Sequence, residues 1–346
     1  MKTNTTDSII EYIKNSSLQS SKEIHDGLKG SIGYATLKRM LSKLLSDDLV
    51  KTEGKGKATR YVISQSFQVL HPIDLDQYFE KEQDERQIKS NFDFDLISGV
   101  LTHVQLFTVE EKQRIETLQS KFTDNVSHLS PSAYNKELER LAIDLSWKSS
   151  QIEGNTYSLL ETERLLKDKE TAAGKPKDDA IMLLNHKDAI NFIVEHPDYV
   201  APISIRAIED IHSLLIKDLE VDRNIRRRKV GISGTNYTPL DNEYQIHEAL
   251  NVMCTLVNSK ENAFEKALLT LILLSYIQAF ADGNKRTARI VSNAVLMAYH
   301  YCPISFRTVD SIEYKKAMLL FYEQNNISAF KKIFIDQFEF AVNTYF

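Results

Sequence analysis

Apolar residues recur with helical spacing along most of the chain beyond residue 130. In residues 131–153, the side chains of Leu138, Leu141, Leu145 and Ile152 fall on one helical face, the pattern of a helix that packs against a core. The same periodicity predicts further helices over residues 159–169, 180–195, 204–217, 243–258, 264–280, 286–300, 311–324 and 329–340. This succession predicts a mainly α-helical body for the larger, C-terminal part of the chain.

One segment of this body departs from the helical pattern. Residues 229–237, KVGISGTNY, alternate β-branched residues with others around Gly231 and Gly234. Because alternation bounded by glycine is typical of two short strands joined by a turn, we expect a small β-hairpin here.

The first 64 residues have a different organisation. Short amphipathic helices are predicted over residues 7–15, from Ser20 or Ser21 to Leu28, and over residues 34–45. Residues 49–52 and 59–63 predict two strands around a glycine-containing turn at residues 54–56. Three helices followed by a hairpin resemble a winged helix-turn-helix domain.

The charge of this first segment favours a nucleic-acid partner. The whole chain carries a net charge of −5, yet residues 1–64 hold 11 Lys and Arg against 7 Asp and Glu. In the DNA-binding interpretation, the third helix enters the major groove and the wing contacts phosphates. The candidate DNA contacts are Lys38, Arg39, Lys43, Lys55, Lys57 and Arg60. The alternative is a protein-interaction or dimerisation module, and tight DNA binding would itself require a homodimer because the local charge is modest.

These patterns predict three parts: a winged-helix-like domain at residues 1–66, a connector with partial helix at 67–129, and the helical body at 130–346. The longest apolar run, residues 267–277, is much shorter than the ~20 residues that span a membrane. The N-terminal residues MKTNTTDSII lack an apolar signal core, so we expect a cytoplasmic protein without membrane association. Two cysteines, Cys254 and Cys302, argue against a disulfide framework or a cysteine-based metal site.

The most informative motif is IQAFADGNKRTAR at residues 277–289. A predicted apolar helix ends at Phe280, residues 282–284 (Asp-Gly-Asn) form a tight turn, and a new helix begins near Arg286. Backbone N–H groups in such a turn and at the start of a helix bind anions.

Charged side chains at this turn sharpen the prediction. Lys285, Arg286 and Arg289 supply three cations, and Asp282 supplies a carboxylate suited to a divalent ion that bridges phosphates. The motif is neither GxxxxGK[ST] nor GxGxxG. It predicts a distinct polyphosphate pocket that suits a nucleotide with Mg²⁺. The structural alternative is a capped helix–turn–helix with surface cations.

The residues of this motif resemble the signature of the Fic family, HxFx(D/E)GN(G/K)RxxR. Phe280, residues 282–286 and Arg289 match it in order. Residues 149–155, SSQIEGN, are similar to the family's inhibitory-helix motif (S/T)xxxE(G/N), and residues 229–239 are similar to its flap hairpin. The resemblance covers roughly residues 130–340 and rests on three separate motifs in the expected order.

This resemblance implies a Fic-type helical bundle with a hairpin flap, which transfers AMP from ATP to a Ser, Thr or Tyr hydroxyl of a protein. It implies that Asp282 binds Mg²⁺ and that Gly283 and Asn284 form an anion hole. Arg286 and Arg289 would hold the β- and γ-phosphates.

The resemblance also implies autoinhibition and a way to dock the target. Glu153, together with Ser149 and Gly154 of the inhibitory motif, would pair with Arg289 and displace the γ-phosphate. Ser149 and Glu153 are four residues apart and therefore share a helix face. The flap would present a target segment by adding it as an extended strand to the flap's edge, through Val230, Gly231, Ile232, Ser233 and Gly234.

Two departures from the family pattern change the expected activity. Gln278 stands where the family has its catalytic His, and a neutral amide cannot act as a general base, whose loss costs about 10²–10⁴ in rate. Lys285 stands where many members have Gly, and the resulting Gly-Asn-Lys sequence resembles the Doc branch of the family, which phosphorylates its target. The sequence therefore leaves three hypotheses: a weak, self-inhibited adenylyltransferase, a non-catalytic ATP-binding transcriptional or interaction regulator, and a Doc-like phosphotransferase.

Two other positions are not expected to change the activity. Ala279 replaces the Pro that is usual in the family, and we expect His212 to pack within its helix and not to replace the missing His.

Overall fold

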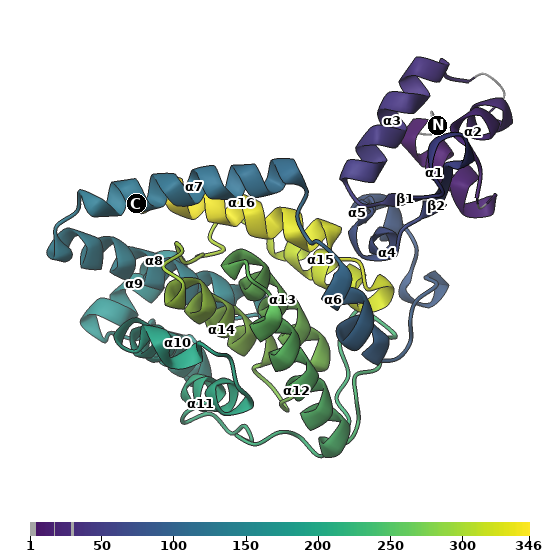
Figure 1. Ribbon diagram of the computed structural model, residues 1–346. Helices are drawn as coiled ribbons and strands as arrows, with labels where there is room; N and C mark the ends of the chain where they lie inside the picture. Colours follow the sequence, from purple (N-terminus) through teal and green to yellow (C-terminus); the bar gives the residue numbers. More distant parts are fainter. Residues whose placement is uncertain (1–4, 17, 29–30) are drawn as a thin grey trace. The chain divides into compact units, whose positions relative to one another are not determined.

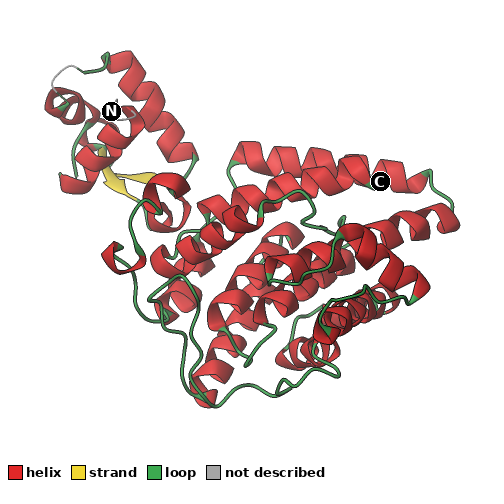
Figure 2. Cartoon of the chain, turned by 180° about the vertical axis from the view of Figure 1, so that it is seen from behind, coloured by secondary structure: helices red, strands yellow, loops and turns green. Residues whose placement is uncertain are grey.

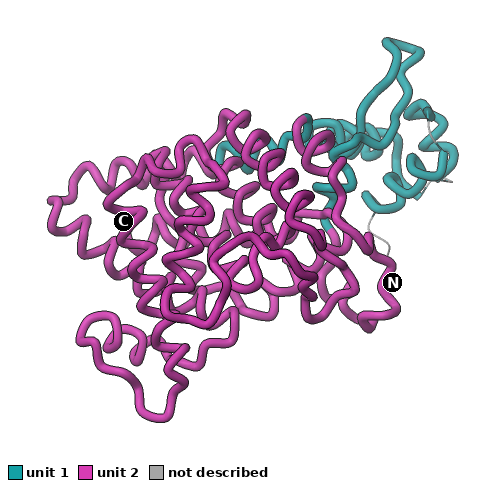
Figure 3. Tube along the Cα trace, turned by 90° about the horizontal axis from the view of Figure 1, so that it is seen from below, with its two compact units in different colours: residues 1–72, 103–114 teal, residues 73–102, 115–346 magenta. Residues whose placement is uncertain are grey.

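The computed structural model describes residues 5–16, 18–28 and 31–346. Residues 1–4, which belong to the stretch searched for a signal core, lie outside the described residues. The chain forms two compact units (Figure 3), one of residues 1–72 and 103–114 and the other of residues 73–102 and 115–346. Almost all regular structure is helical, with a single small sheet in the described part (Figure 2). The predicted mainly α fold is confirmed.

Unit 1 contains the predicted order of three helices and a strand–turn–strand. Its elements are α1 (Thr5–Asn15), α2 (Ser21–Gly27), α3 (Tyr34–Ser46), β1 (Val50–Glu53), η1 (Gly56–Ala58), β2 (Arg60–Ile63) and α4 (Ser66–Leu70). The strands pair antiparallel, with Val50 opposite Ile63. Ser20 begins α2 with a capping box that it forms with Glu23. Apolar faces of α1 and α3 are buried, which explains why the amphipathic pattern located them.

Unit 2 is a helical bundle (Figure 1). Its elements are α5 (Leu75–Tyr78), η2 (Gln83–Glu85), the π-helical turn η3 (Leu96–Val100), α8 (Pro131–Ile152), α9 (Leu159–Asp168), α10 (Lys177–Glu195), η4 (Pro197–Val200), α11 (Ile205–Leu215), α12 (Glu243–Ser259), α13 (Ala263–Ile277), α14 (Asn284–Ala298), α15 (Ser311–Gln324) and α16 (Ser328–Thr344). Residues of α6 (Leu101–His103) and α7 (Val109–Ser127) belong to both units.

The core of unit 2 is built around α13 and α14, which lie in the middle of the bundle in Figure 1. Every residue of α13 is buried, as expected for a helix that is apolar on all sides. Asn262 begins it by accepting hydrogen bonds from the backbone N–H groups of Phe264 and Glu265. α14 packs against α13 and buries most of its own residues. The bundle therefore holds the turn between these two helices rigidly.

The helices that flank this turn begin and end differently from the prediction. α13 ends at Ile277, three residues before the predicted end, because Gln278 adopts a left-handed conformation with φ of 53°. α14 begins at Asn284, two residues before the predicted start, after Gly283 with φ of 77°. The connection is therefore an irregular loop of residues 278–283, which places more backbone beside the start of α14.

The hairpin predicted at residues 229–237 is wrong, because no strand pairing occurs there in the described part of the chain. The segment is an irregular extended loop with a turn at Ser233 and Gly234. Within the segment, the Gly234 carbonyl accepts from Arg86 over 2.5 Å. Directly after it, the Thr238 N–H donates to the Ser90 carbonyl over 2.8 Å. We keep the name flap loop for residues 229–237.

Arg86 also anchors this region through a buried ion pair. Its Nε donates to Oε2 of Glu323 in α15 over 3.1 Å, and its Nη2 donates to Oε1 over 3.1 Å. The side chains of Arg86 and Glu323 are 6% and 1% exposed. Residues of the predicted connector thus brace the flap loop against α15.

Replacing Arg86 with methionine should destabilise the protein by about 3–5 kcal/mol, because it leaves the buried Glu323 carboxylate with the Tyr78 hydroxyl but without a cation. The control is Lys316→Met, which breaks a pair with Asp76, a side chain that is 93% exposed. That change should cost at most about 1 kcal/mol. Urea unfolding of the two variants measures both values, and equal losses would contradict the structural role of Arg86.

Two further observations concern membrane-spanning helices and the two cysteines. Within the described residues, no helix combines the length and the apolar character that crossing a bilayer requires. Cys254 and Cys302 are free thiols in the core. Burial raises the pKa of the Cys254 thiol to about 12, which makes it a packing residue rather than a reactive one.

Candidate functional site

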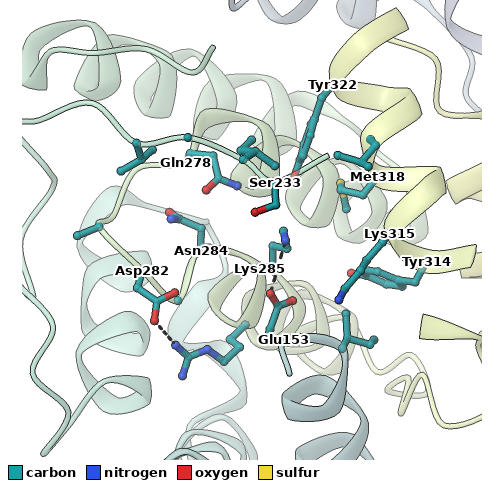
Figure 4. Close-up of a pocket in the computed structure, with 18 residues that line it drawn as sticks. Glu153, Ser233, Gln278, Asp282, Asn284, Lys285, Tyr314, Lys315, Met318 and Tyr322 are labelled. Atoms are coloured by element: carbon teal, nitrogen blue, oxygen red, sulfur yellow. Dashed lines mark hydrogen bonds and ion pairs between the residues drawn. The ribbon is translucent and has the colours of Figure 1, made fainter. Parts of the chain in front are cut away.

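A pocket of about 350 Å³ lies at the loop between α13 and α14 (Figure 4). The start of α14, the end of α8, the flap loop and α15 all contribute to its walls. The lining residues include Glu153, Val230, Gly231, Ile232, Ser233, Gln278, Asp282, Gly283, Asn284, Lys285, Arg286, Tyr314, Lys315, Met318 and Tyr322. Residues that are distant in sequence therefore meet at the predicted anion-binding turn.

The loop of residues 278–283 is held in shape by two polar side chains. Asn284 accepts from the Phe280 N–H and donates to the Phe280 carbonyl, each over 2.8 Å. Arg226, which is 2% exposed, donates from Nε to the Gln278 carbonyl over 2.6 Å and from Nη2 to the Leu240 carbonyl. The sequence analysis did not identify Arg226, since no spacing indicates that an arginine will bind carbonyls. The loop is consequently preorganised.

Gly283 is required where the loop meets α14. Its φ is 77°, and a Cβ atom there would lie 3.2 Å from Cε1 of His212. His212 in turn stacks on Phe280 with ring centroids 3.7 Å apart. Burial lowers the pKa of His212 to about 4, so the ring is neutral at physiological pH. The structure supports the prediction that His212 serves packing, because it does not line the pocket.

The pocket presents a buried donor that lacks a partner. Among the described residues, Nη1 of Arg286 completes no hydrogen bond, although this side chain is only 2% exposed and lines the pocket. The buried hydroxyl groups of Tyr314 and Tyr322 also line the pocket, close to Arg289 and Gln278 respectively. Buried polar groups are normally satisfied, so the free donor of Arg286 points to a polar ligand in the pocket. The start of α14, where the first backbone N–H groups of a helix have no intrahelical acceptor, borders the same pocket.

The cations predicted from the motif are divided between the pocket and the core. Lys285 and Arg286 line the pocket, whereas Arg289 is fully buried behind it. α15 adds Lys315, an exposed lysine whose ammonium points toward Glu153 (Figure 4). Sequence analysis missed Lys315 because it is far from the motif along the chain, and only the fold brings α15 to the pocket.

Glu153 lines the pocket and bonds to the buried Arg289. It follows the last residue of α8, and its Oε1 accepts from Arg289 Nη2 over 2.9 Å. Its Oε2 lies 3.5 Å from Lys285 Nζ. Arg289 also donates from Nε and Nη2 to the side chain and the carbonyl of Ser149 over 2.7 and 2.9 Å. Gly154, with φ of 101°, ends the helix just beyond the acid. The inhibitory residues and the signature arginine therefore meet.

The charge state of Glu153 supports a stable contact. Burial acts to raise the pKa of Glu153, but the nearby Arg289, Lys285 and Arg286 outweigh it and hold the pKa below the ordinary 4.5. A carboxyl with a lowered pKa contributes stability above its ordinary pKa and loses it as the pH falls through the lowered value. The Glu153 contact is thus fully formed at neutral pH.

Gln278 lines the pocket at the position that corresponds to the family's His. Its side-chain Nε2 donates to the Ser275 carbonyl over 2.6 Å, and only 7% of the residue is exposed. The hydroxyl of Tyr322 lies near this amide. The arrangement can orient a bound group, but it offers no proton acceptor of the strength of an imidazole.

Four of the five predicted flap residues line the pocket: Val230, Gly231, Ile232 and Ser233. Gly234 does not. It faces Leu319 of α15, and a Cβ atom added there would lie 3.2 Å from Leu319 Cδ1. The mouth of the pocket is therefore edged by an extended backbone, although not by a hairpin.

Asp282 suits a metal only in combination with phosphates. Its carboxylate is 64% exposed at the rim, and its Oδ2 accepts from Arg286 Nη2 over 2.8 Å. The described residues contain no group of three or more His, Cys, Asp or Glu able to hold a metal. Because Mg²⁺ commonly binds through one or two carboxylates plus substrate phosphates, the single carboxylate fits Mg²⁺ delivered with a nucleotide.

The candidate DNA contacts occupy unit 1. Lys38, Arg39 and Lys43 are exposed on α3, and Lys55 and Lys57 are exposed around η1. Arg60 differs, since it donates to the carbonyls of Lys57 and Thr59 and lies 3.9 Å from Glu23. Five of the six predicted side chains are thus available to a partner, and Arg60 is largely engaged within the unit.

Comparison with known proteins agrees with this geometry. The Fic/DOC family model matches residues 202–296, which include the flap loop and the turn before α14. "Protein adenylyltransferase Fic" of Nematostella vectensis is 28% identical over 183 residues, 49% of this chain and 40% of that protein. The protein of the same name from Aedes aegypti is 27% identical over 205 residues, 56% of this chain and 40% of that protein. The chain thus matches about 40% of the length of these relatives.

Solved structures show the same fold. Fic-1 (residues 134–508) from C. elegans superposes with a TM-score of 0.60 at 21% identity, over 68% of this chain and 72% of that chain. A Fic domain containing signaling protein from Bacteroides thetaiotaomicron gives a TM-score of 0.56 at 19% identity, over 66% and 96% of the two chains. Residues 202–296 of this protein are therefore a Fic/DOC family domain within a bundle of the Fic fold.

Proposed function

We propose that unit 2 is a nucleotide-dependent protein-modifying domain of the adenylyltransferase type, self-inhibited by Glu153 and weak because Gln278 replaces the catalytic base. The observation that carries the proposal is the ion pair between Glu153, which lines the pocket, and the fully buried Arg289. A carboxylate in an arginine fork occupies the donors that a phosphate would use. The names of the relatives support AMP transfer to a protein target.

In this proposal ATP is a substrate, and its phosphates lie along the start of α14. Arg286 receives the β-phosphate through its unpartnered Nη1, and Arg289 receives the γ-phosphate once Glu153 withdraws. The oxygen of a target Ser, Thr or Tyr hydroxyl attacks the α-phosphorus. The bond from that phosphorus to the bridging oxygen breaks, and pyrophosphate leaves.

The proposed reaction has no general base at Gln278 to accept the proton of the attacking hydroxyl. Gln278 can accept a hydrogen bond from the hydroxyl through its amide oxygen, but it cannot take the proton at neutral pH. The proton must therefore pass to solvent. Catalysis then relies on positioning and charge stabilisation, which supply much of the rate in phosphoryl transfer.

Asp282 would hold Mg²⁺ together with the phosphates. The ion would neutralise charge on the phosphate oxygens as it develops during transfer. Arg286 bonds only Oδ2 of Asp282, through Nη2. Oδ1 of Asp282 could therefore bind the ion while Nη1 of Arg286 bonds a phosphate.

The experiment that tests the proposal compares α-labelled with γ-labelled ATP on the protein carrying both Glu153→Gly and Gln278→His. Label from α-labelled ATP on the protein itself or on cell-lysate proteins is the expected result. Label from γ-labelled ATP alone would instead establish the Doc-like phosphotransfer that Lys285 suggests. Transfer of neither label would contradict an enzymatic role.

A second candidate function follows from Gln278 and unit 1 together. A nucleotide-binding regulator without catalysis would use ATP occupancy of unit 2 to change DNA or protein binding by unit 1. The exposed cations of α3 and the wing favour DNA as that partner. This candidate would fail if the protein bound neither nucleotide by calorimetry nor DNA at low salt.

If α3 contacts phosphates, replacing Arg39 with glutamine should weaken DNA binding similarly for all sequences. It should also reduce the slope of log affinity against log salt by about one unit. Lys14→Gln is the matched control, because Lys14 is an exposed lysine on α1. Fluorescence anisotropy across a salt series measures both slopes. An unchanged slope for Arg39→Gln would favour the protein-interaction alternative.

A further inference from the structure

The hydrogen bonds of Arg289 continue away from the pocket into α10. Arg289 Nε donates to Ser149 Oγ over 2.7 Å, and that oxygen lies 2.9 Å from Nε2 of His186. His186 Nδ1 lies 3.2 Å from the carbonyl oxygen of Met182, one turn earlier in α10. The side chains of Ser149, His186 and Arg289 are all 0% exposed. Sequence analysis did not identify His186, because it belongs to no motif and stands within a predicted helix.

The protons in this chain of bonds are assigned by the chemistry of its two ends. The Met182 carbonyl only accepts, so His186 Nδ1 carries the proton and Nε2 is an acceptor. Arg289 only donates, so Ser149 Oγ accepts from it and gives its own proton to His186 Nε2. Burial, aided by the nearby Arg286 and Arg289, lowers the pKa of His186 to about 3. The ring is neutral at physiological pH, as this assignment requires.

We propose that His186 is a positioning residue that, through Ser149, keeps Arg289 in its binding orientation after Glu153 withdraws. The inference rests on the proposed function, in which Arg289 receives the terminal phosphate. It adds that the inhibition is released by movement of the Glu153 side chain while α8 and Arg289 stay in place.

The contacts of Arg289 support a release in which Glu153 moves and Arg289 stays in place. Two of its hydrogen bonds go to Ser149, and one goes to Glu153. Ser149 lies in the buried last turn of α8, which packs against α10 and α14. Glu153 stands beyond that turn, its side chain is 21% exposed, and Gly154 follows it. Glu153 can therefore turn toward solvent without disturbing the bonds to Ser149, and the guanidinium remains preorganised for an anion.

The test uses the full chain carrying Glu153→Gly, with one added change at a time. His186→Leu removes the acceptor for the Ser149 hydroxyl, and His186→Gln restores one through its Oε1. Asn185→Leu is the matched control: Asn185 is a buried neighbour in α10 that bonds the carbonyls of Leu215 and Lys217. Within the described part of the chain, Asn185 forms no hydrogen bond with Ser149 or Arg289.

The first measurement needs no nucleotide. Exchange of the Arg289 Nε–H with solvent, followed by NMR, should be slow with Glu153→Gly alone, with added His186→Gln and with added Asn185→Leu. Added His186→Leu should accelerate it by about tenfold or more, because the Ser149 hydroxyl no longer has a fixed orientation. An unchanged rate in His186→Leu would overturn the proposal. Equal acceleration by Asn185→Leu would overturn it too, since it would report general loosening of α10.

The second measurement is binding of ATP and ADP by calorimetry. Added His186→Leu should weaken ATP binding roughly tenfold and ADP binding by less than about twofold, because ADP lacks the terminal phosphate that Arg289 would hold. Equal losses for the two nucleotides would contradict a positioning role. If the Glu153→Gly protein bound no nucleotide at all, the proposed function would fail, and the exchange measurement would still decide whether His186 positions Arg289.

Discussion

Replacing Glu153 with glycine should raise the affinity for ATP–Mg²⁺ by roughly 10- to 100-fold. The change removes the carboxylate that holds Arg289 Nη2 at 2.9 Å and Lys285 Nζ at 3.5 Å. A charge-assisted hydrogen bond is worth about 1.5–3 kcal/mol, which sets this range. The affinity for ADP should rise less than the affinity for ATP, because ADP lacks the γ-phosphate that competes with Glu153. Titration calorimetry with ATP and ADP measures both gains.

Two controls separate this effect from a general change in charge. Glu153→Gln keeps an acceptor without the charge and should give an intermediate ATP affinity. Glu139→Gln also removes an acid from α8, but Glu139 lies near Lys187 on the exposed side and should leave the affinity unchanged. Wild-type affinity for ATP in the Glu153→Gly protein would show that Glu153 does not occupy a phosphate position.

Replacing Gln278 with histidine should increase transfer of α-label from ATP by about 10²–10⁴ in the Glu153→Gly background. The Gln278 amide already donates to the Ser275 carbonyl over 2.6 Å. A histidine that donated its Nδ1–H to the same carbonyl would present Nε2 to the pocket as a base. Gln278→Leu, which offers no acceptor, should be no faster than the glutamine protein.

The pH dependence gives this prediction a second readout. A general base acts only when unprotonated, so transfer by the histidine variant should rise with pH through about 6.5 and then level off. The glutamine protein should show no such step. A gain in rate without this pH step would mean that the histidine acts by orienting the hydroxyl and not by accepting its proton.

The elements that could be predicted from the sequence are those whose signals are local. The stripe ending at Ile152 located α8, and the four-residue spacing put Ser149 and Glu153, the residue that follows the helix, on the same side, where both bond Arg289. The glycine and charges of residues 282–289 located the turn before α14. Each of these inferences needed only the residues within a few turns of the chain.

Other features depend on contacts between distant segments. The alternation of residues 229–237 predicted a hairpin, but the Gly234 carbonyl bonds to Arg86, and Thr238, which follows the segment, bonds to Ser90. Tertiary contacts override local strand preference in this way. Arg226 and Lys315 were missed for the same reason, because only the folded bundle brings them to the site.

A crystal structure of the Glu153→Gly protein with ATP and Mg²⁺ tests most directly whether Glu153 occupies a phosphate position. We expect the γ-phosphate bonded to Arg289 where the Glu153 carboxylate now lies, with the β-phosphate at Arg286 and the ion at Asp282. A triphosphate bound elsewhere, or a γ-phosphate that leaves Arg289 untouched, would contradict the claim that Glu153 takes the place of a phosphate.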